Sequence, residues 1–249
     1  MIVYSCFSHK GGREHNEDYM GCFTDQDTCR QAFVLADGLG GHGQGEVASA
    51  MAVDAFLLEF KGQEGLGDGC LNRLIDCANQ AVISGQSVSL AKKGMGAVLA
   101  AGLYDRGVFR ALNVGDTRLY YFRDEALYQV TKDHSMSQLA VDMGTISRRD
   151  IPKSPDRNRV LRVLGDEDLT SATLYEEITP REGDGFLLCT DGAWEYLDDM
   201  EIAADLCKSE NPLQWKEYLL KRILPRQKEG CDNFSMICGM FMGRGFEEV

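Results

Sequence analysis

Two aspartates lie where an apolar segment runs into a glycine. Asp37 follows "QAFVLA" and precedes Gly38, and Asp191 follows "FLLCT" and again precedes a glycine. Carboxylate and backbone carbonyl oxygens, together with water, are the ligands that Mg²⁺ and Mn²⁺ prefer. A glycine after the aspartate lets the backbone bend so that its carbonyl can also face a cation. The repeated pattern therefore indicates a divalent metal site.

The same stretch also matches a nucleotide-binding pattern. Gly38, Gly40 and Gly43 satisfy G-x-G-x-x-G, in which a glycine-rich turn brings backbone N–H groups to a pyrophosphate. Asp37, directly before the first glycine, would repel that anion. The expected strands also cluster along the chain instead of alternating with helices, which fits a doubly wound fold poorly. A cation is therefore favoured over a nucleotide.

Further charged residues occur where strands are expected to meet turns. Asp116 lies in "LNVGDTRLYY", and Asp232 in "GCDNFSM" opens the last expected strand. One such aspartate would be an ordinary turn residue, but four of them indicate a shared oxygen-rich site. Near the N-terminus, Glu17 and Asp18 add a further acidic pair, and Arg13 could bind an anionic substrate through two parallel hydrogen bonds. Divalent metals beside an arginine point to phosphate chemistry.

The elements that must position these residues follow from hydrophobic periodicity and turn signals. An antiparallel meander is expected over 94–131, with "DRG", "VGD" and "RDE" as hairpin turns. A polar segment over 132–169 follows it. The other expected strands are 1–8, 19–25, 31–37, 174–179 and 233–242, and the expected helices are 45–61, 68–84, 201–208 and 212–223.

Composition restricts the class of protein. The 249 residues carry 39 acidic and 26 basic side chains, a net charge of −13, which disfavours non-specific binding to nucleic acid or to an anionic membrane. No apolar run approaches the length of a membrane span, so a cytoplasmic location is expected. Nine scattered cysteines indicate neither a disulfide framework nor a zinc ribbon.

Seven short motifs occur in a characteristic order: "REHNED", "VLADGLGGHGQGE", "GMGAV", "LNVGDTRLYYF", "TKDHS", "LLCTDGAWEYL" and "DNFSMI". This set resembles the metal-dependent serine/threonine phosphatases of the PPM family, the protein phosphatase 2C type, in their compact bacterial form. The resemblance implies an α+β fold, a four-layer αββα sandwich of two antiparallel sheets flanked by helix pairs. It implies one catalytic domain over 1–249 with a flap over about 136–170. Ala97 and Val98 replace the threonines common after "GMG", which affects local packing but no expected ligand.

The resemblance also implies metal ligands. Asp37 is expected to bridge two ions, the carbonyl of Gly38 to bind one of them, and Asp191 and Asp232 to complete the other. Asp18 is expected to hold metal-bound water. The ions are expected to be Mn²⁺ or Mg²⁺.

Three further roles come from the same resemblance. Arg13 is expected to bind the substrate phosphate, and Asp116 with Asp191 to form a weaker third ion site. Protonation of the leaving group is open between His42 and metal-bound water, and His42 could instead only shape its loop.

The implied reaction is hydrolysis of phosphoserine and phosphothreonine by a hydroxide that bridges the two ions. The expected partners are phosphorylated proteins, either substrates of a serine/threonine kinase or that kinase itself, with no nucleic acid and no membrane, and the chain is expected to be a monomer. The alternative is an inactive pseudophosphatase that binds a partner. The arginines of the polar segment could select acidic phosphopeptides or stay solvated, and the solvated state is favoured.

Overall fold

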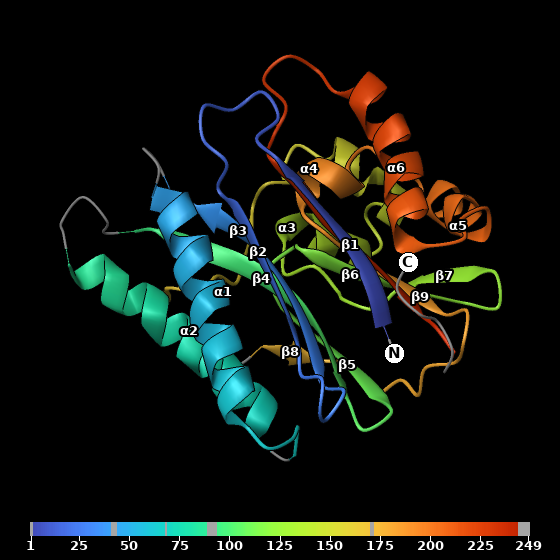
Figure 1. Cartoon of the computed structure of the whole chain (residues 1–249). Helices are drawn as coiled ribbons and strands as arrows, with labels where there is room; N and C mark the ends of the chain where they lie inside the picture. Colours follow the sequence, from blue (N-terminus) through green and yellow to red (C-terminus); the bar gives the residue numbers. More distant parts are fainter. Residues whose placement is uncertain (1, 41–43, 68, 89–93, 170–171, 244–249) are drawn as a thin grey trace.

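Two antiparallel five-stranded sheets form the centre of the protein (Figure 1). The computed structural model describes residues 2–40, 44–67, 69–88, 94–169 and 172–243. One sheet has the strand order β1-β10-β9-β6-β7, and the other has the order β2-β3-β4-β5-β8. The strands of the first sheet are β1 (Ile2–His9), β10 (Phe234–Phe241), β9 (Gly185–Cys189), β6 (Arg118–Arg123) and β7 (Ala126–Gln129). Those of the second are β2 (Asp18–Thr24), β3 (Gln31–Leu39), β4 (Gly96–Asp105), β5 (Val108–Val114) and β8 (Thr173–Leu174).

Helices cover the outer faces of both sheets. The pair α1 (Gln44–Gly62) and α2 (Cys70–Ser87) packs on the second sheet, and α5 (Asp199–Cys207) and α6 (Pro212–Ile223) pack on the first (Figure 1). A third core between the sheets contains Phe33, Phe109 and Phe186. Three apolar cores in succession make the four layers expected of an αββα sandwich.

Local sequence explains the elements that flank the site. The run "AFVLA" in β3 is fully buried, because this central strand has the other sheet on one face and α1 on the other. In α1, the residues Ala48, Ala52, Phe56 and Phe60 recur every four positions and form one buried stripe. Helix α6 is capped by Asn211, which precedes it and whose side chain accepts a hydrogen bond from the Gln214 N–H.

The structure differs from the sequence expectation in the meander. The turns "DRG" and "RDE" do join the hairpins β4–β5 and β6–β7, but "VGD" is not a hairpin turn. Strand β5 lies in one sheet and β6 in the other, so this turn carries the chain between sheets. Because the chain changes sheets there, Asp116 lies between the end of a strand in one sheet and the beginning of a strand in the other.

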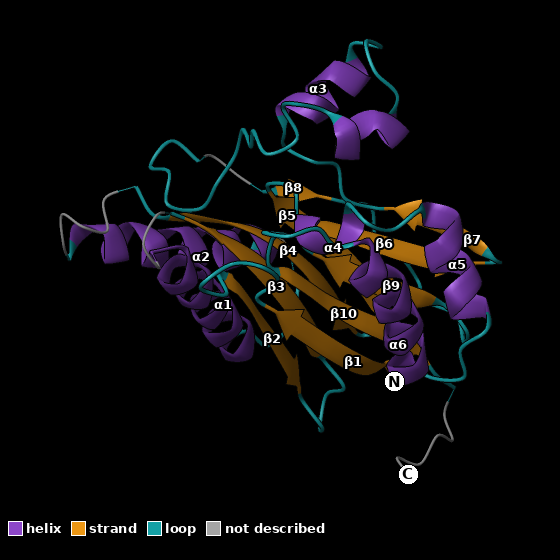
Figure 2. Cartoon of the chain, turned by 90° about the horizontal axis from the view of Figure 1, so that it is seen from above, coloured by secondary structure: helices purple, strands orange, loops and turns teal. Residues whose placement is uncertain are grey.

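The polar segment contains structure that periodicity did not predict. It holds α3 (Met136–Asp142) and the 3₁₀ helix η2 (Arg148–Lys153), which project from the sandwich above α4 (Asp191–Trp194) (Figure 2). A second 3₁₀ helix, η3 (Leu224–Arg226), extends α6. The strand expected at 174–179 was largely wrong, because β8 covers Thr173–Leu174 and residues 175–179 contain only an isolated bridge at Ile178. Among the described residues, no helix has both the length and the apolar character needed to cross a bilayer.

Candidate metal and phosphate site

Asp18 and Asp37 are direct neighbours across two paired strands. The register of β2 and β3 places Asp18 opposite Asp37. Asp37 was expected as the last residue of its strand, but β3 continues through Gly38 to Leu39. Backbone pairing on both sides of β3 therefore holds this carboxylate rigidly.

Gly38 allows the end of β3 to touch the beginning of α1. A Cβ atom on Gly38 would lie 2.0 Å from the carbonyl oxygen of Gly45, and one on Gly45 would lie 2.6 Å from the Gly38 oxygen. The Gly38 N–H donates to the Glu17 carbonyl at 3.0 Å. Only two glycines permit this backbone approach, which fixes the direction of the Gly38 carbonyl.

Asp116 is held by contacts from two other segments. Gly115 before it has φ = 100°, a conformation that favours glycine. The Gly115 N–H donates to His134 Nδ1, and the His134 N–H donates to the Gly115 carbonyl, both at 2.9 Å. Trp194 Nε1 donates to the Asp116 carbonyl at 3.1 Å. The "VGD" turn is therefore held by hydrogen bonds to its backbone, which leaves the Asp116 carboxylate free to bind a cation.

Asp191 begins α4, and Asp232 lies in the loop before β10. The two segments touch, since a Cβ on Gly192 would lie 2.0 Å from the Asn233 carbonyl oxygen. Asp232 accepts a hydrogen bond from the Asn233 N–H at 2.9 Å. It also forms an ion pair with Arg13 Nη2 at 2.8 Å. Arg13 therefore lies beside the carboxylates although more than 200 residues separate it from Asp232.

These segments enclose a cavity of about 160 Å³. It brings together six of the eight residues given a role in the expected site, namely Arg13, Asp37, Gly38, Asp116, Asp191 and Asp232, and Glu17 also lines it. Asp18 lies behind this lining and accepts a hydrogen bond from the Thr190 hydroxyl at 3.0 Å. His42 lies outside the described residues.

The carboxylates make an unfavourable group of charges. Burial raises the pKa of Asp18 to about 7, and the nearby Asp232 adds to the rise. Burial also raises the pKa of Asp116 to about 7 and holds the pKa values of Asp37 and Asp191 well above their ordinary range, with neighbouring carboxylates contributing. A cation among these groups would stabilise their ionised forms.

Unpartnered oxygens provide a second indication of a cation site. Asp18 Oδ1 and Asp191 Oδ1 are buried and have no hydrogen-bond partner among the described residues. Within that same set, no three His, Cys, Asp or Glu side chains already form a metal-coordinating cluster. The carboxylates surround the cavity without meeting at one point, as expected of like charges. The all-oxygen donor set fits a hard divalent cation such as Mg²⁺ or Mn²⁺.

Comparison with known proteins agrees with this chemistry. The family model described as protein phosphatase 2C matches residues 7–224. The chain belongs to the protein phosphatase 2C family. A serine/threonine phosphatase, stp, from Listeria welshimeri is 32% identical over 210 residues, which cover 82% of each chain.

Solved phosphatase structures share the fold. The serine/threonine phosphatase Stp1 from Staphylococcus aureus superposes with a TM-score of 0.87 at 28% identity, covering 98% of this chain and 96% of that one. The catalytic domain of the phosphatase PstP, solved with two manganese ions, gives 0.83 at 28% identity over 97% and 99% of the two chains. Neither these relatives nor the site favours the pseudophosphatase alternative.

Sequence reasoning missed Asn233, an uncharged residue that holds two segments of the phosphatase site together. The Asn233 side chain donates to the carbonyls of Lys10 and His15 and accepts from the Glu17 N–H, all at 2.8–2.9 Å. It thereby joins the N-terminal loop of Arg13 to the segment of Asp232. Its place directly after Asp232 was the only local signal, because the partners lie at the other end of the chain.

Proposed function

We propose that this chain is a metal-dependent protein serine/threonine phosphatase that hydrolyses phosphoserine and phosphothreonine. The observation that carries the proposal is the convergence of Arg13 with Asp37, Asp116, Asp191 and Asp232 on one cavity. Carboxylates supply ligands for divalent cations, and a guanidinium supplies a bidentate partner for phosphate. Membership of the protein phosphatase 2C family supports the same activity.

The residues proposed to hold two ions are Asp37, the carbonyl of Gly38, Asp191 and Asp232, with Asp18 behind them. Asp116 and Asp191 are proposed to hold a weaker third ion. Manganese and magnesium both suit this donor set, and the PstP structure with two manganese ions supports a two-ion core. When bound, such ions activate a water molecule as the nucleophile and stabilise negative charge on the phosphoryl oxygens.

The protein's own groups bind and orient the substrate. Arg13 is proposed to bind the phosphate, and its side chain is 53% exposed, so an incoming phosphoryl group can reach its remaining N–H donors. The role of His42 as the acid for the leaving group stays a prediction. No cysteine is required, and burial raises the pKa of Cys189 beside Asp191, which disfavours a thiolate there.

The substrates are proposed to be phosphorylated proteins, including targets of a serine/threonine kinase or that kinase itself. We further propose one catalytic domain over 1–249 with a flap at about 136–170, acting as a monomer in the cytoplasm without nucleic acid.

The test is phosphate release from a phosphothreonine peptide with Mn²⁺, with Mg²⁺ and with excess EDTA. We expect turnover with either cation and none with EDTA. Asp37→Asn and Asp191→Asn should each lower kcat at least 100-fold, since residues that only support a metal ligand already cost about 10–100-fold and these two are proposed as the ligands themselves. Asp124→Asn is the matched control, because Asp124 is exposed and its φ of 52° suits asparagine. Full turnover in EDTA would overturn the metal requirement, and turnover by Asp37→Asn at the control rate would overturn the ligand assignment.

A further inference from the structure

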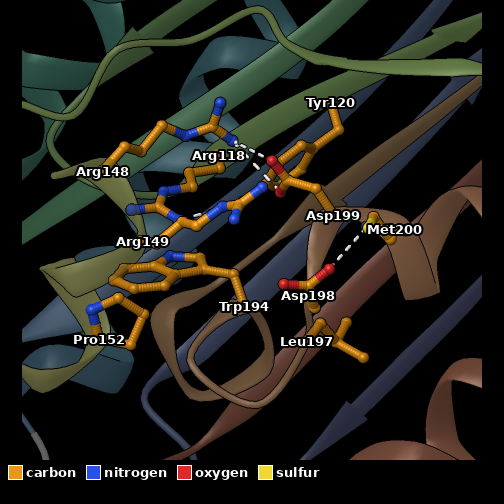
Figure 3. Close-up of a pocket in the computed structure, with 10 residues that line it drawn as sticks. All are labelled: Arg118, Tyr120, Arg148, Arg149, Pro152, Trp194, Leu197, Asp198, Asp199 and Met200. Carbon is orange, nitrogen blue, oxygen red and sulfur yellow. Dashed lines mark hydrogen bonds and ion pairs between the residues drawn. The ribbon is translucent and has the colours of Figure 1, made fainter.

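A second cavity lies between β6, the 3₁₀ helix η2 and the beginning of α5, and nothing in the proposed reaction uses it (Figure 3). Its volume is about 330 Å³, room for roughly ten water molecules and therefore for a hydrated side chain. Three arginine side chains, Arg118, Arg148 and Arg149, enter it together, and the Trp194 ring lies beneath them in this view (Figure 3).

Two of the three arginines that line this cavity are paired with carboxylates, Arg118 with Asp133 and Arg148 with Asp199. Two carboxylates also line it, but both are engaged. Asp199 accepts an ion pair from Arg148 at 3.0 Å, and Asp198 caps α5 by accepting from the Met200 N–H at 2.9 Å. The Arg149 side chain has no ion pair or hydrogen bond to any residue that the structure describes. An exposed cation without a partner is notable in a chain with a net charge of −13.

The floor of the cavity presents buried donors. Arg118 is 4% exposed, stacks over the Trp194 ring at 3.5 Å and forms an ion pair with Asp133 at 2.6 Å. Its Nη1 donates to the Tyr120 hydroxyl at 3.1 Å. Tyr120 is 2% exposed, and burial raises its pKa to about 12, so the hydroxyl keeps its proton. Within the described part of the chain that proton has no acceptor. An anionic ligand in the cavity would accept this hydrogen bond in place of water.

This cavity adjoins the catalytic one. Asp191 at the start of α4 lines the catalytic cavity, and Trp194 at its end lines the second. Three residues of helix span about 5 Å along the axis. The segment after η2 also reaches both places, because Arg149 and Pro152 line the second cavity while Asn158 and Val160 line the catalytic one.

We propose that the second cavity is a substrate subsite that binds an acidic side chain near the phosphorylated residue, with Arg149 and the Tyr120 hydroxyl as its donors. The inference rests on the proposed phosphatase activity and adds a substrate preference to it. In an extended peptide each residue advances the chain by about 3.5 Å, so a side chain one or two residues from the phosphoserine lies roughly 4–7 Å away. That range includes the distance of about 5 Å along α4 between the residues that line the two cavities.

The proposed subsite gives one arginine of the polar segment a role in binding, in place of the expected solvated state. Arg148 and Arg157 form ion pairs with Asp199 and Glu195, which position the segment against the sandwich. Arg149 forms no such ion pair with a described residue, so its guanidinium can bind a ligand.

The test compares phosphoserine peptides that differ by one glutamate or glutamine, scanned from four residues before to four residues after the phosphoserine, with the full chain in Mn²⁺. At one or two positions, glutamate should raise kcat/KM about tenfold over glutamine, the effect of one charge-assisted hydrogen bond. Arg149→Gln and Tyr120→Phe should each lower that ratio severalfold. Neither should change kcat/KM for p-nitrophenyl phosphate, which is too small to reach the second cavity.

Arg181→Gln is the matched control, since Arg181 is exposed and lines neither cavity. Equal kcat/KM for glutamate and glutamine peptides at every position would overturn the subsite. So would an equal loss of preference in Arg149→Gln and Arg181→Gln, because it would assign the preference to overall charge. A wild-type chain that releases no p-nitrophenol in Mn²⁺ would instead overturn the proposed phosphatase activity.

Discussion

His134 offers a direct test of how the Asp116 turn is held. Its Nδ1 accepts the Gly115 N–H at 2.9 Å, and its Nε2 lies 2.7 Å from the Thr173 hydroxyl. Burial lowers the pKa of His134 from 6.5 to about 4, and the charge of Arg162 adds to this. The folded protein therefore keeps this ring neutral at a pH where the unfolded chain binds a proton.

The sign of the pH effect follows from that difference. Above pH 6.5 both states hold a neutral ring and His134 adds no pH dependence. As the pH falls toward 4, the unfolded state gains a proton that the folded state refuses, so the free energy of unfolding decreases. For these pKa values the loss between pH 7.5 and pH 5 is at most about 2 kcal/mol.

His134→Asn separates this effect from the other titrations. The asparagine carbonyl can still accept the Gly115 N–H, but the bond to Thr173 is lost, at a cost of about 1 kcal/mol. The variant should therefore be less stable than wild type by about 1 kcal/mol at pH 7.5, and at pH 5 this difference should shrink or reverse, to at most about 1 kcal/mol in favour of the variant. Urea unfolding in EDTA at both pH values measures the gap, and carboxylate titrations common to both proteins cancel.

His9→Asn is the matched control, because exposed His9 also accepts a backbone N–H, from Gly11 at 3.0 Å. A gap between wild type and His134→Asn that is equal at pH 7.5 and pH 5 would refute the reasoning. It would mean that the folded protein admits a proton on this ring.

Three further predictions concern the proposed site. Arg13→Ala should raise KM for a phosphopeptide about tenfold; calorimetric loss of Mn²⁺ affinity with KM unchanged would contradict this. Asp116→Ala should slow turnover while two Mn²⁺ ions still bind and the fold persists, because Trp194 bonds to its backbone carbonyl; unchanged kinetics would leave Asp116 only a turn residue. Gly38→Ala should lower the free energy of unfolding by about 1–3 kcal/mol, since its Cβ would meet the Gly45 oxygen, and an unchanged Tm would refute that contact.

Much of the architecture could be predicted from local pattern. Helix α6 occupies the residues expected from its periodicity, and β1, β2, β3 and β10 differ from expectation by no more than two residues at either end. Assignment to the protein phosphatase 2C family was also confirmed. These features depend on neighbouring side chains and on short motifs, which a chain carries without reference to its fold.

The "VGD" turn shows where local pattern was insufficient. Two apolar runs joined by a tight turn have the same sequence pattern whether the strands they form pair with each other or lie in different sheets. The choice depends on which strands are already neighbours: β5 pairs with β4, while β6 pairs with β9, whose sequence comes some 65 residues later. The roles of the site residues stay predictions.

The sequence by itself determined the residue types of the site: aspartates at strand ends, glycines beside them and an arginine near the N-terminus. Only the tertiary structure decided which of them share a cavity, because Arg13 meets Asp232 through the pairing of β1 with β10 at opposite ends of the chain. It also decided that Asp18 lies behind the cavity and that Arg149 and Tyr120 face a second one. Burial and unpartnered donors are properties of packing between distant segments, so no local stretch of sequence encodes them.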